Sequence, residues 1–270
     1  MNGNPQSKFG GNSSVTATLI PPHEPASGPI FFREGDEEVA LVLPPGASED
    51  TCPICQGPLT GNNENCINCE ENSRALDGVA QPIIPISLYS KPSVARDWLT
   101  FYKTNGDAEA HPSAREAVGR VLERFLNENI EWLTDLNADV AVVVPSTLRP
   151  PPHPLAELLQ ERNCLPFELI HSLRRTTARL GHNQPSQEAF EAPENLRGKR
   201  VFLIDDVYTS GARAQSAAYA LRTTGATIAA LCIIGRRYNP SYSQQSADIF
   251  RRQSEKPFAW TISQRNPTRT

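Results

Sequence analysis

The stretch at residues 201–213, VFLIDDVYTSGAR, is the part of the sequence that decides the fold. Four apolar residues run into two adjacent acids, Asp205 and Asp206, and a short Thr-Ser-Gly turn follows. The apolar run predicts a strand over 201–204 that is buried on both faces, and the alanine-rich segment 212–224 predicts the helix that follows it. A strand that passes through a tight turn into a helix is typical of one repeat of an α/β sheet.

The same alternation extends on both sides of this stretch. The predicted elements are a helix over 113–133 that opens with a capping box of Ser113 and Glu116, a buried strand over 138–144, a short helix over 153–163, a strand over 166–170, a polar loop over 174–199 and a strand over 228–234. Apolar strands alternating with helices predict a parallel twisted sheet with helices on both faces, an α/β fold. Ligands of such sheets bind at the carboxyl ends of the strands, so the search narrows to the loops after the three apolar strands.

Composition favours one or two globular domains and no membrane-spanning segment. The chain has 270 residues, of which 39% are hydrophobic, and no apolar run approaches the roughly 18 residues that a spanning helix needs. The N-terminal MNGNPQSKFGGNSSV lacks the basic-then-apolar pattern of a signal peptide. The sequence therefore predicts a cytoplasmic protein without a membrane partner.

Changes in composition divide the chain into four parts. They are a flexible N-terminal arm at 1–48, a four-cysteine unit at 49–80, the α/β domain at 85–240 and a basic C-terminal tail at 241–270. The arm is rich in Pro, Gly, Asn and Ser, which disfavour a packed core. Its two apolar segments, IFF and EVALVLP, are expected to form a hairpin or an edge strand.

Four of the six cysteines form two C-x₂-C pairs that are ten residues apart. They are Cys52, Cys55, Cys66 and Cys69. Two pairs of thiolates at this spacing fit a tetrahedral Zn²⁺ site, and the second pair argues against a redox or disulfide pair. Because the protein supplies all four ligands, we expect a structural zinc ion without a catalytic role. Cys164 and Cys232 stand alone in apolar surroundings and are expected to be inert core thiols.

Local charge differs between the cysteine unit and the end of the chain. Residues 49–78 hold six acids and one base, a balance that repels a phosphate backbone and favours protein contact or plain stabilisation. From Arg236 onward, seven bases face two acids. This segment either contacts single-stranded DNA or an acidic protein partner, or is a solvated tail.

The acid pair and the turn after it suit the two ends of a sugar phosphate. Ionised carboxylates only accept hydrogen bonds, so Asp205 and Asp206 suit the vicinal hydroxyls of a sugar or a Mg²⁺ ion held through water. The turn presents unpaired backbone N–H groups and the positive end of a helix dipole to an anion. Its residues are Thr209, Ser210, Gly211 and Ala212. A ribose 5-phosphate satisfies both ends, whereas the alternative is an ordinary strand–turn–helix unit with solvated acids.

The stretch VFLIDDVYTSGA resembles the phosphoribosyl-pyrophosphate (PRPP) binding motif of type I phosphoribosyltransferases. A four-cysteine unit ahead of such a domain resembles the ComF-type competence proteins, which are often labelled amidophosphoribosyltransferase-like. The shared order covers about residues 50–238 and includes FYKTNGD, VVVPS and LIDDVYTSGA. Ser210 stands where the family usually has Thr. Arg213 stands where it has Thr or a small residue, and either pairs with the phosphate or points to solvent.

The resemblance implies phosphoribosyl transfer from PRPP to a nucleobase or amine acceptor, with Mg²⁺ and release of pyrophosphate. It implies that Asp205 and Asp206 bind the ribose and contribute to catalysis. It also places Ser146, Thr147 and Arg149 at the pyrophosphate, with Arg149 as the charged group. Further candidates are Lys103, Asp107, His171, Arg174, Arg175, Arg179, His182, Arg236 and Arg237.

A second function of a different class fits the same motif. The domain is either an enzyme or a non-catalytic PRPP sensor, or an accessory protein for DNA uptake or regulation, because fold and ligand motif do not fix the chemistry. The resemblance also suggests a homodimer. The acceptor carries no motif in this chain.

Overall fold

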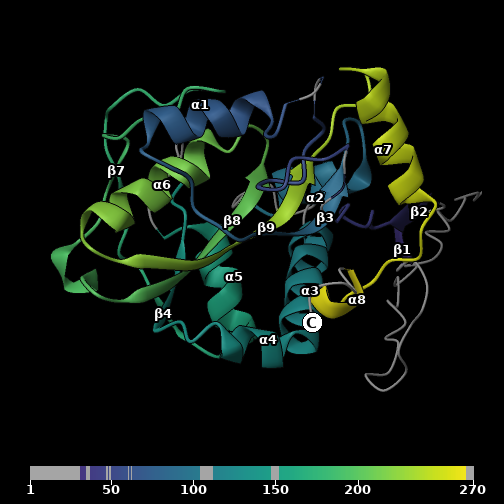
Figure 1. Cartoon of the computed structure of the whole chain (residues 1–270). Coiled ribbons are helices and arrows are strands. Elements are labelled where there is room, and N and C mark those ends of the chain that lie inside the picture. The colour runs from purple at the N-terminus through teal and green to yellow at the C-terminus, as the bar shows by residue number, and fades with distance from the viewer. Residues whose placement is uncertain are drawn as a thin grey trace, which may run out of the picture.

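A five-stranded parallel sheet forms the centre of the computed structural model (Figure 1). The structure describes residues 31–34, 37–46, 48, 50–59, 61, 63–103, 112–146 and 152–265. The strands, in the order β3-β9-β8-β4-β5, are β3 (Ile83–Tyr89), β9 (Thr227–Arg237), β8 (Arg200–Tyr208), β4 (Val140–Val143) and β5 (Glu168–Ile170). Every neighbouring pair is parallel, which confirms the predicted sheet.

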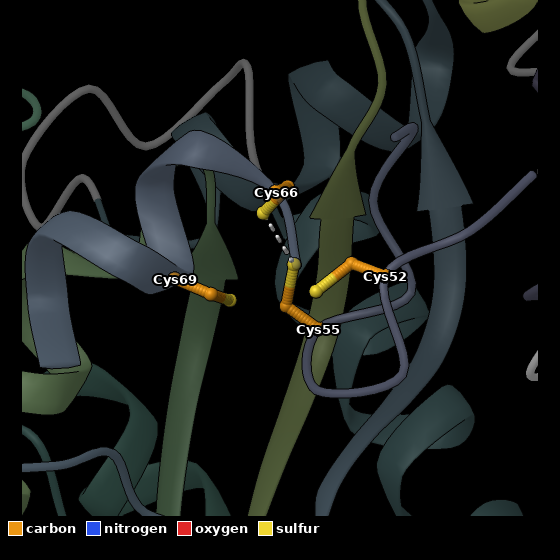
Figure 2. A group of neighbouring side chains, drawn as sticks. All are labelled: Cys52, Cys55, Cys66 and Cys69. Carbon is orange, nitrogen blue, oxygen red and sulfur yellow. Dashed lines mark hydrogen bonds between the residues drawn. The ribbon is translucent and has the colours of Figure 1, made fainter. Parts of the chain in front are cut away.

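The four-cysteine unit precedes the sheet and ends in a helix. Cys52 and Cys55 lie on the loop before this helix, α1 (Ile67–Ala75), and Cys66 is its N-cap residue. Figure 2 shows the side chains of both pairs turned toward one another. The two C-x₂-C pairs are therefore brought together as predicted.

Helices cover both faces of the sheet because the central strands alternate their apolar side chains. Phe202 and Ile204 of β8 pack on one face, and Val201 and Leu203 pack on the other. The first face is covered by α2 (Val94–Phe101), α3 (Pro112–Glu128), α4 (Ile130–Asp135) and α5 (Pro154–Arg162), and the second by α1 and α6 (Ala212–Thr223). This arrangement confirms the α/β class.

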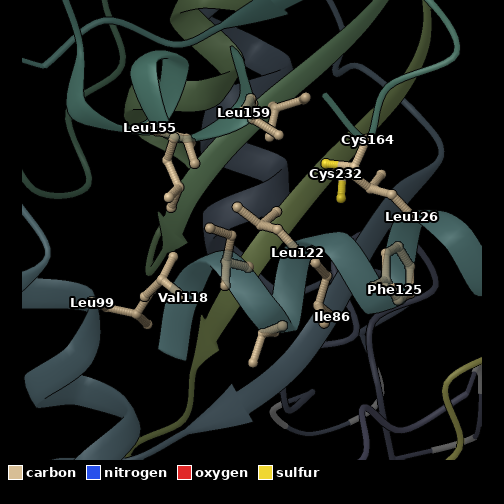
Figure 3. Close-up of a cluster of buried hydrophobic side chains, with 14 of the residues drawn as sticks. Ile86, Leu99, Val118, Leu122, Phe125, Leu126, Leu155, Leu159, Cys164 and Cys232 are labelled. Carbon is tan, nitrogen blue, oxygen red and sulfur yellow. The ribbon is translucent and has the colours of Figure 1, made fainter. Parts of the chain in front are cut away.

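The larger core lies between the sheet and the first group of helices (Figure 3). Val118, Leu122 and Phe125 of α3 are buried in it. Cys164 and Cys232 also lie here as buried free thiols. Burial raises the pKa of Cys164 to about 11 and that of Cys232 to about 12, so both remain protonated at neutral pH. This agrees with their expected role as core thiols.

The helix predicted over 113–133 is divided in two at Asn129, which separates α3 from α4. The buried Asn129 amide donates hydrogen bonds to the backbone oxygens of Phe125, at 2.7 Å, and Trp260, at 2.9 Å. Trp260 comes from the far end of the chain. The break therefore depends on a tertiary contact that the helical period does not contain.

Two strands of the predicted arm form a hairpin. β1 (Phe31–Glu34) pairs antiparallel with β2 (Glu37–Ala40), as expected for the two apolar segments. Directly after it, Val42 docks on the sheet edge, since its carbonyl oxygen accepts a hydrogen bond from the Leu88 amide at 2.8 Å. Residues 1–30 lie outside the described residues, so the predicted flexibility of the arm stays a prediction.

The polar loop predicted over 174–199 has structure of its own. It holds a short antiparallel pair, β6 (Arg174–Arg175) and β7 (Phe190–Glu191), and a 3₁₀ turn at Glu194–Leu196. The Arg175 guanidinium donates to three backbone oxygens of this loop at 2.6, 2.8 and 2.6 Å. Arg175 therefore stabilises the loop itself.

Much of the segment predicted as a basic tail packs on the domain. It contains α7 (Gln244–Ser254) and α8 (Ile262–Arg265), and Phe258 and Trp260 between them are buried. The Arg265 guanidinium donates to two backbone oxygens of β3 at 2.7 and 3.0 Å. In the described part of the chain, no helix is both long and apolar enough to cross a membrane.

Candidate functional site

Both acids of the central motif lie inside β8. The apolar run predicts a strand that ends at Ile204, but β8 continues to Tyr208. The strand continues because β9 is also longer than predicted and pairs with it beyond the acids, with Asp205 opposite Ile233. Asp205 and Asp206 are fully buried as a result. The prediction that the strand ends at Ile204, before the acids, is therefore wrong.

Three side chains donate hydrogen bonds or pair their charge with the acids. Tyr102 and Lys103 follow α2, and Arg213 lies in α6. The Arg213 guanidinium, in the first turn of α6, donates to Asp206 Oδ1 at 2.7 Å, to Asp205 Oδ2 at 3.2 Å and also to Asp205 Oδ1. The Tyr102 hydroxyl donates to Asp206 Oδ2 at 2.6 Å, and the Lys103 ammonium pairs with the same oxygen. All four carboxylate oxygens thus have donors. Arg213 is therefore paired with both acids and does not simply point to solvent, and its pairing with a phosphate stays a prediction.

The two acids differ in the environment of their charge. Burial, together with the neighbouring Asp206 charge, raises the pKa of Asp205 to about 7, although Arg213 opposes this. Burial acts in the same direction on Asp206. There, however, Lys103 and Arg213 outweigh it and hold the pKa of Asp206 well below its usual range. Asp206 is therefore ionised across the physiological range.

The turn after β8 depends on a glycine. Gly211 has φ +85° and is the N-cap residue of α6, and a Cβ atom there would lie 2.1 Å from the Tyr208 hydroxyl oxygen. The neighbouring Ser210 is buried, and its hydroxyl oxygen accepts a hydrogen bond from the backbone N–H of Asn183 at 3.2 Å. Its backbone oxygen accepts one from the Asn72 side chain of α1 at 2.9 Å. Two distant segments therefore fix the turn.

A cavity of about 530 Å³ opens over the turn and the acid pair. Ser146, at the end of β4, and His182 line it. Its cationic lining residues are Lys91, Arg96, Lys103 and Arg213. The residues of the turn, Thr209, Ser210, Gly211 and Ala212, form another part of the wall. The sequence analysis identified neither Lys91 nor Arg96 as a site residue. The one feature of the sequence that could have indicated them is their position after the apolar strand β3.

Other predicted residues lie elsewhere. His171 contacts Gln160 at 3.0 Å on the surface, Arg174 forms an exposed ion pair with Glu191, and Arg179 is exposed. Thr147, Arg149 and Asp107 lie outside the described residues. Their roles stay predictions.

The four cysteines form a buried cluster that can hold a metal ion. The sulfur atoms of Cys52, Cys55, Cys66 and Cys69 all lie within 4.8 Å of one another (Figure 2). All four residues are buried. A set of four sulfur donors at these distances is compatible with a tetrahedral ion such as zinc.

Arg236 joins this cluster to the turn, and sequence reasoning left open whether it is solvated. Its side chain is only 3% exposed. The guanidinium donates to the Cys55 backbone oxygen at 3.1 Å and sulfur at 3.4 Å, and to the Tyr208 and Thr209 backbone oxygens at 3.1 and 2.6 Å. Among the described residues no carboxylate contacts it. Thiolates are then its negative partners, and thiolates are the form that binds a metal.

Comparisons with known proteins give structural neighbours only. No protein-family model and no curated protein matches the chain. A solved structure described as the allosteric regulatory enzyme of purine biosynthesis is 20% identical, with a TM-score of 0.35. The alignment covers 52% of this chain, which spans only 30% of that protein.

Two further neighbours are phosphoribosyltransferases. The orotate phosphoribosyltransferase of Mycobacterium tuberculosis is 19% identical with a TM-score of 0.31, over 56% of this chain and 74% of that one. A phosphoribosyltransferase from Corynebacterium diphtheriae is 16% identical with a TM-score of 0.31, over 70% of this chain and 91% of that one. Because these TM-scores lie below 0.5, the function has to be inferred from the site itself.

Proposed function

We propose that this chain binds PRPP at the turn after β8 and transfers its phosphoribosyl group to a nitrogen acceptor, with release of pyrophosphate. The observation that carries the proposal is the position of the Gly211 turn. It joins a central parallel strand to the N-terminus of α6 and faces a cavity lined by four cations. The unpaired N–H groups of a helix N-terminus attract an anion. The turn is therefore assigned to the 5-phosphate, with the Thr209 and Ser210 hydroxyls as further donors.

The cations are assigned to the pyrophosphate. Departure of pyrophosphate from the anomeric carbon moves negative charge onto the leaving group, and groups already in place to meet that charge accelerate the step. Lys91, Arg96 and Lys103 come from the end of β3 and from α2 and line the same cavity as the turn. Ser146, three residues after the end of β4, lines the same cavity. Arg149 keeps its predicted role at the pyrophosphate as part of this proposal.

The acceptor is assigned to a second cavity of about 230 Å³ beside the first. Both cavities are bordered by Thr209, Ser210 and His182, so an acceptor in the second lies next to a ligand in the first. Ile67 and Tyr242 border the second cavity and are 54% and 64% exposed, a large exposure for apolar and aromatic side chains. They suit the faces of a planar nucleobase.

Zn²⁺ is proposed as the ion of the cysteine unit, with a structural role. The buried Arg236 guanidinium supports this, because its negative partner is the thiolate cluster. A bound ion fixes the loop of Cys55 and thereby the donors that reach the turn from that side. Metal analysis of the purified chain that finds no zinc, or less than half an equivalent, would contradict this assignment.

Calorimetry with PRPP and a pyrophosphate-release assay test the enzyme proposal. We expect heat of binding with PRPP, and release with at least one member of a panel of nucleobases and ammonia. The S210A variant should bind PRPP at least tenfold more weakly, whereas S241A, at an exposed position outside both cavities, should bind it normally. Absence of PRPP binding by the metal-loaded chain would overturn the proposal.

A non-catalytic PRPP sensor is the second candidate. The observation in its favour is the engagement of both acids by Arg213, which keeps them from the role predicted for them in catalysis. Tight PRPP binding without pyrophosphate release for any acceptor would decide for the sensor. Salt-sensitive binding of single-stranded DNA that is weakened by replacing the exposed Arg251 and Arg252 would instead indicate the accessory role.

A further inference from the structure

We propose that this site binds the pyrophosphate group of its ligand without a divalent cation, and that the Arg213 guanidinium and the Lys103 ammonium stand where the metal charge would act. The inference rests on the proposed function and names the ionic form of the ligand that the site accepts. It also departs from the expected role of Mg²⁺, because the acid pair does not fit a site for that ion.

The acid pair has no free oxygen to offer a metal or its water shell. Both oxygens of Asp205 accept hydrogen bonds from Arg213, and Asp205 Oδ1 also accepts one from the Asp206 amide at 2.9 Å. The two oxygens of Asp206 are held by Arg213 on one side and by Tyr102 and Lys103 on the other. The side chains of both acids are no more than 1% exposed. Mg²⁺ needs near-octahedral oxygen ligands, and none is accessible on this pair.

The two cations are more accessible than the acids that they cover. The side chains of Arg213 and Lys103 are 23% and 21% exposed. Both line the 530 Å³ cavity. A ligand in the cavity therefore meets a guanidinium and an ammonium before it meets a carboxylate. A guanidinium binds phosphate oxygens in pairs, and an ammonium binds them as a point charge.

The charge of the cavity wall favours a bare polyanion over its metal complex. Lys91, Arg96, Lys103 and Arg213 give four positive charges, whereas Asp206 is the one acid among the residues described as lining the cavity. Arg96 shares its charge with the exposed Asp97, at 3.0 Å. Burial lowers the pKa of Lys91, and the nearby positive charges of Arg237 and Arg96 lower it further. Lys91 thus lies in a positive field that attracts pyrophosphate and repels a free divalent cation.

Arg213 is the residue that carries this inference. The motif that residues 201–212 resemble has Thr or a small residue at position 213, and such a side chain cannot reach either acid with a charge. In this chain the guanidinium lies in the first turn of α6, seven and eight residues after the acids. Replacement of Arg213 should therefore uncover the acid pair and restore a site that a hydrated metal ion can approach.

A titration of the intact, zinc-loaded chain with inorganic pyrophosphate and with PRPP tests the inference. Calorimetry is carried out in metal-depleted buffer without a chelator, so that the cysteine unit keeps its ion, and again with 5 mM Mg²⁺. We expect both probes to bind without Mg²⁺. Mg²⁺ should strengthen neither affinity, because it converts each free probe into the metal complex that this cavity disfavours. In the R213T variant we expect metal-free pyrophosphate affinity to fall at least tenfold and to recover partly with Mg²⁺. The R251M variant, on the exposed face of α7, is the control.

The outcomes separate the two proposals. PRPP binding that appears only with Mg²⁺ in the wild-type chain overturns this inference and leaves the proposed function intact. Metal-free binding of pyrophosphate without any binding of PRPP supports the inference and overturns the proposed function. No binding of either probe under either condition overturns both. Because the wild-type titration alone decides these cases, the test stands even where R213T fails to fold.

Discussion

Replacement of the buried Arg236 by methionine should destabilise the chain and loosen the turn that faces the cavity. The guanidinium donates hydrogen bonds to four backbone oxygens, those of Cys55, Tyr208, Thr209 and Arg237. A buried carbonyl that loses its donor costs about 1–3 kcal/mol, although such costs do not add fully. Part of the loss is offset because a cation no longer has to be buried. We expect a net loss of about 3–5 kcal/mol in the free energy of unfolding.

Thermal unfolding and metal retention measure this loss. For a chain of this size about 1 kcal/mol corresponds to about 2–4 °C, so R236M should unfold about 6–20 °C below the wild type. It should also release its zinc faster to a chromogenic chelator, since the thiolates lose their cationic neighbour. The G57A variant tests the same contact without removing charge, because a Cβ atom at Gly57 would lie 2.4 Å from the Arg236 guanidinium.

The R251M variant is again the matched control, because Arg251 is 62% exposed and its replacement should change stability by less than about 0.5 kcal/mol. If R236M matched R251M in both unfolding temperature and zinc release, the linkage between the cysteine unit and the turn would be refuted.

Three further predictions follow from the same geometry. G211A should bind PRPP at least tenfold more weakly in calorimetry and unfold at lower temperature, because its Cβ atom meets the Tyr208 hydroxyl and its φ of +85° is strained for alanine. Burial raises the pKa of Asp205 to about 7 in the folded chain, whereas the unfolded carboxyl titrates near 3.8. The free energy of unfolding in urea should therefore fall as pH rises from about 4 to 7 and level off above, with a slope of at most about 1.4 kcal/mol per unit, and D205N should lack this slope. Removal of zinc by a strong chelator should lower both the unfolding temperature and the affinity for PRPP, although no cysteine lines the PRPP cavity, and return of zinc should restore both.

The sequence predicted those parts of the fold that depend on local patterns. The apolar runs placed the core of β4, β8 and β9, and the Thr-Ser-Gly turn placed the start of α6 at Ala212. The C-x₂-C spacing predicted the cysteine cluster, because each pair brings two sulfur atoms into one short turn. Each of these features is encoded within about a dozen residues.

The contacts of the acid pair could not be predicted in this way. Tyr102 lies 104 residues before Asp206, and only the packing of α2 against the sheet brings its hydroxyl to that carboxylate. Arg213 is close in sequence, but its choice of partner depends on how deeply the acids are buried. That depth follows from the extension of β8 along β9, which is a tertiary contact. The same limit applies to Arg236, whose partner Cys55 lies on a loop 181 residues away.

The conformation of the turn explains why a cysteine unit lies beside this site. A turn that directs the N–H groups of a helix N-terminus toward a cavity directs successive carbonyl groups away from it, and buried carbonyl groups need donors. The backbone oxygens of Tyr208 and Thr209 receive theirs from Arg236, and that of Ser210 receives its donor from Asn72 on α1. Both donors belong to or contact the cysteine unit. Arg236 donates to the Cys55 backbone oxygen, and Asn72 lies on α1, the helix of that unit. The cysteine unit therefore provides hydrogen-bond donors for the carbonyl groups of the turn. The N–H groups on the opposite side of the turn then remain directed toward an anion in the cavity.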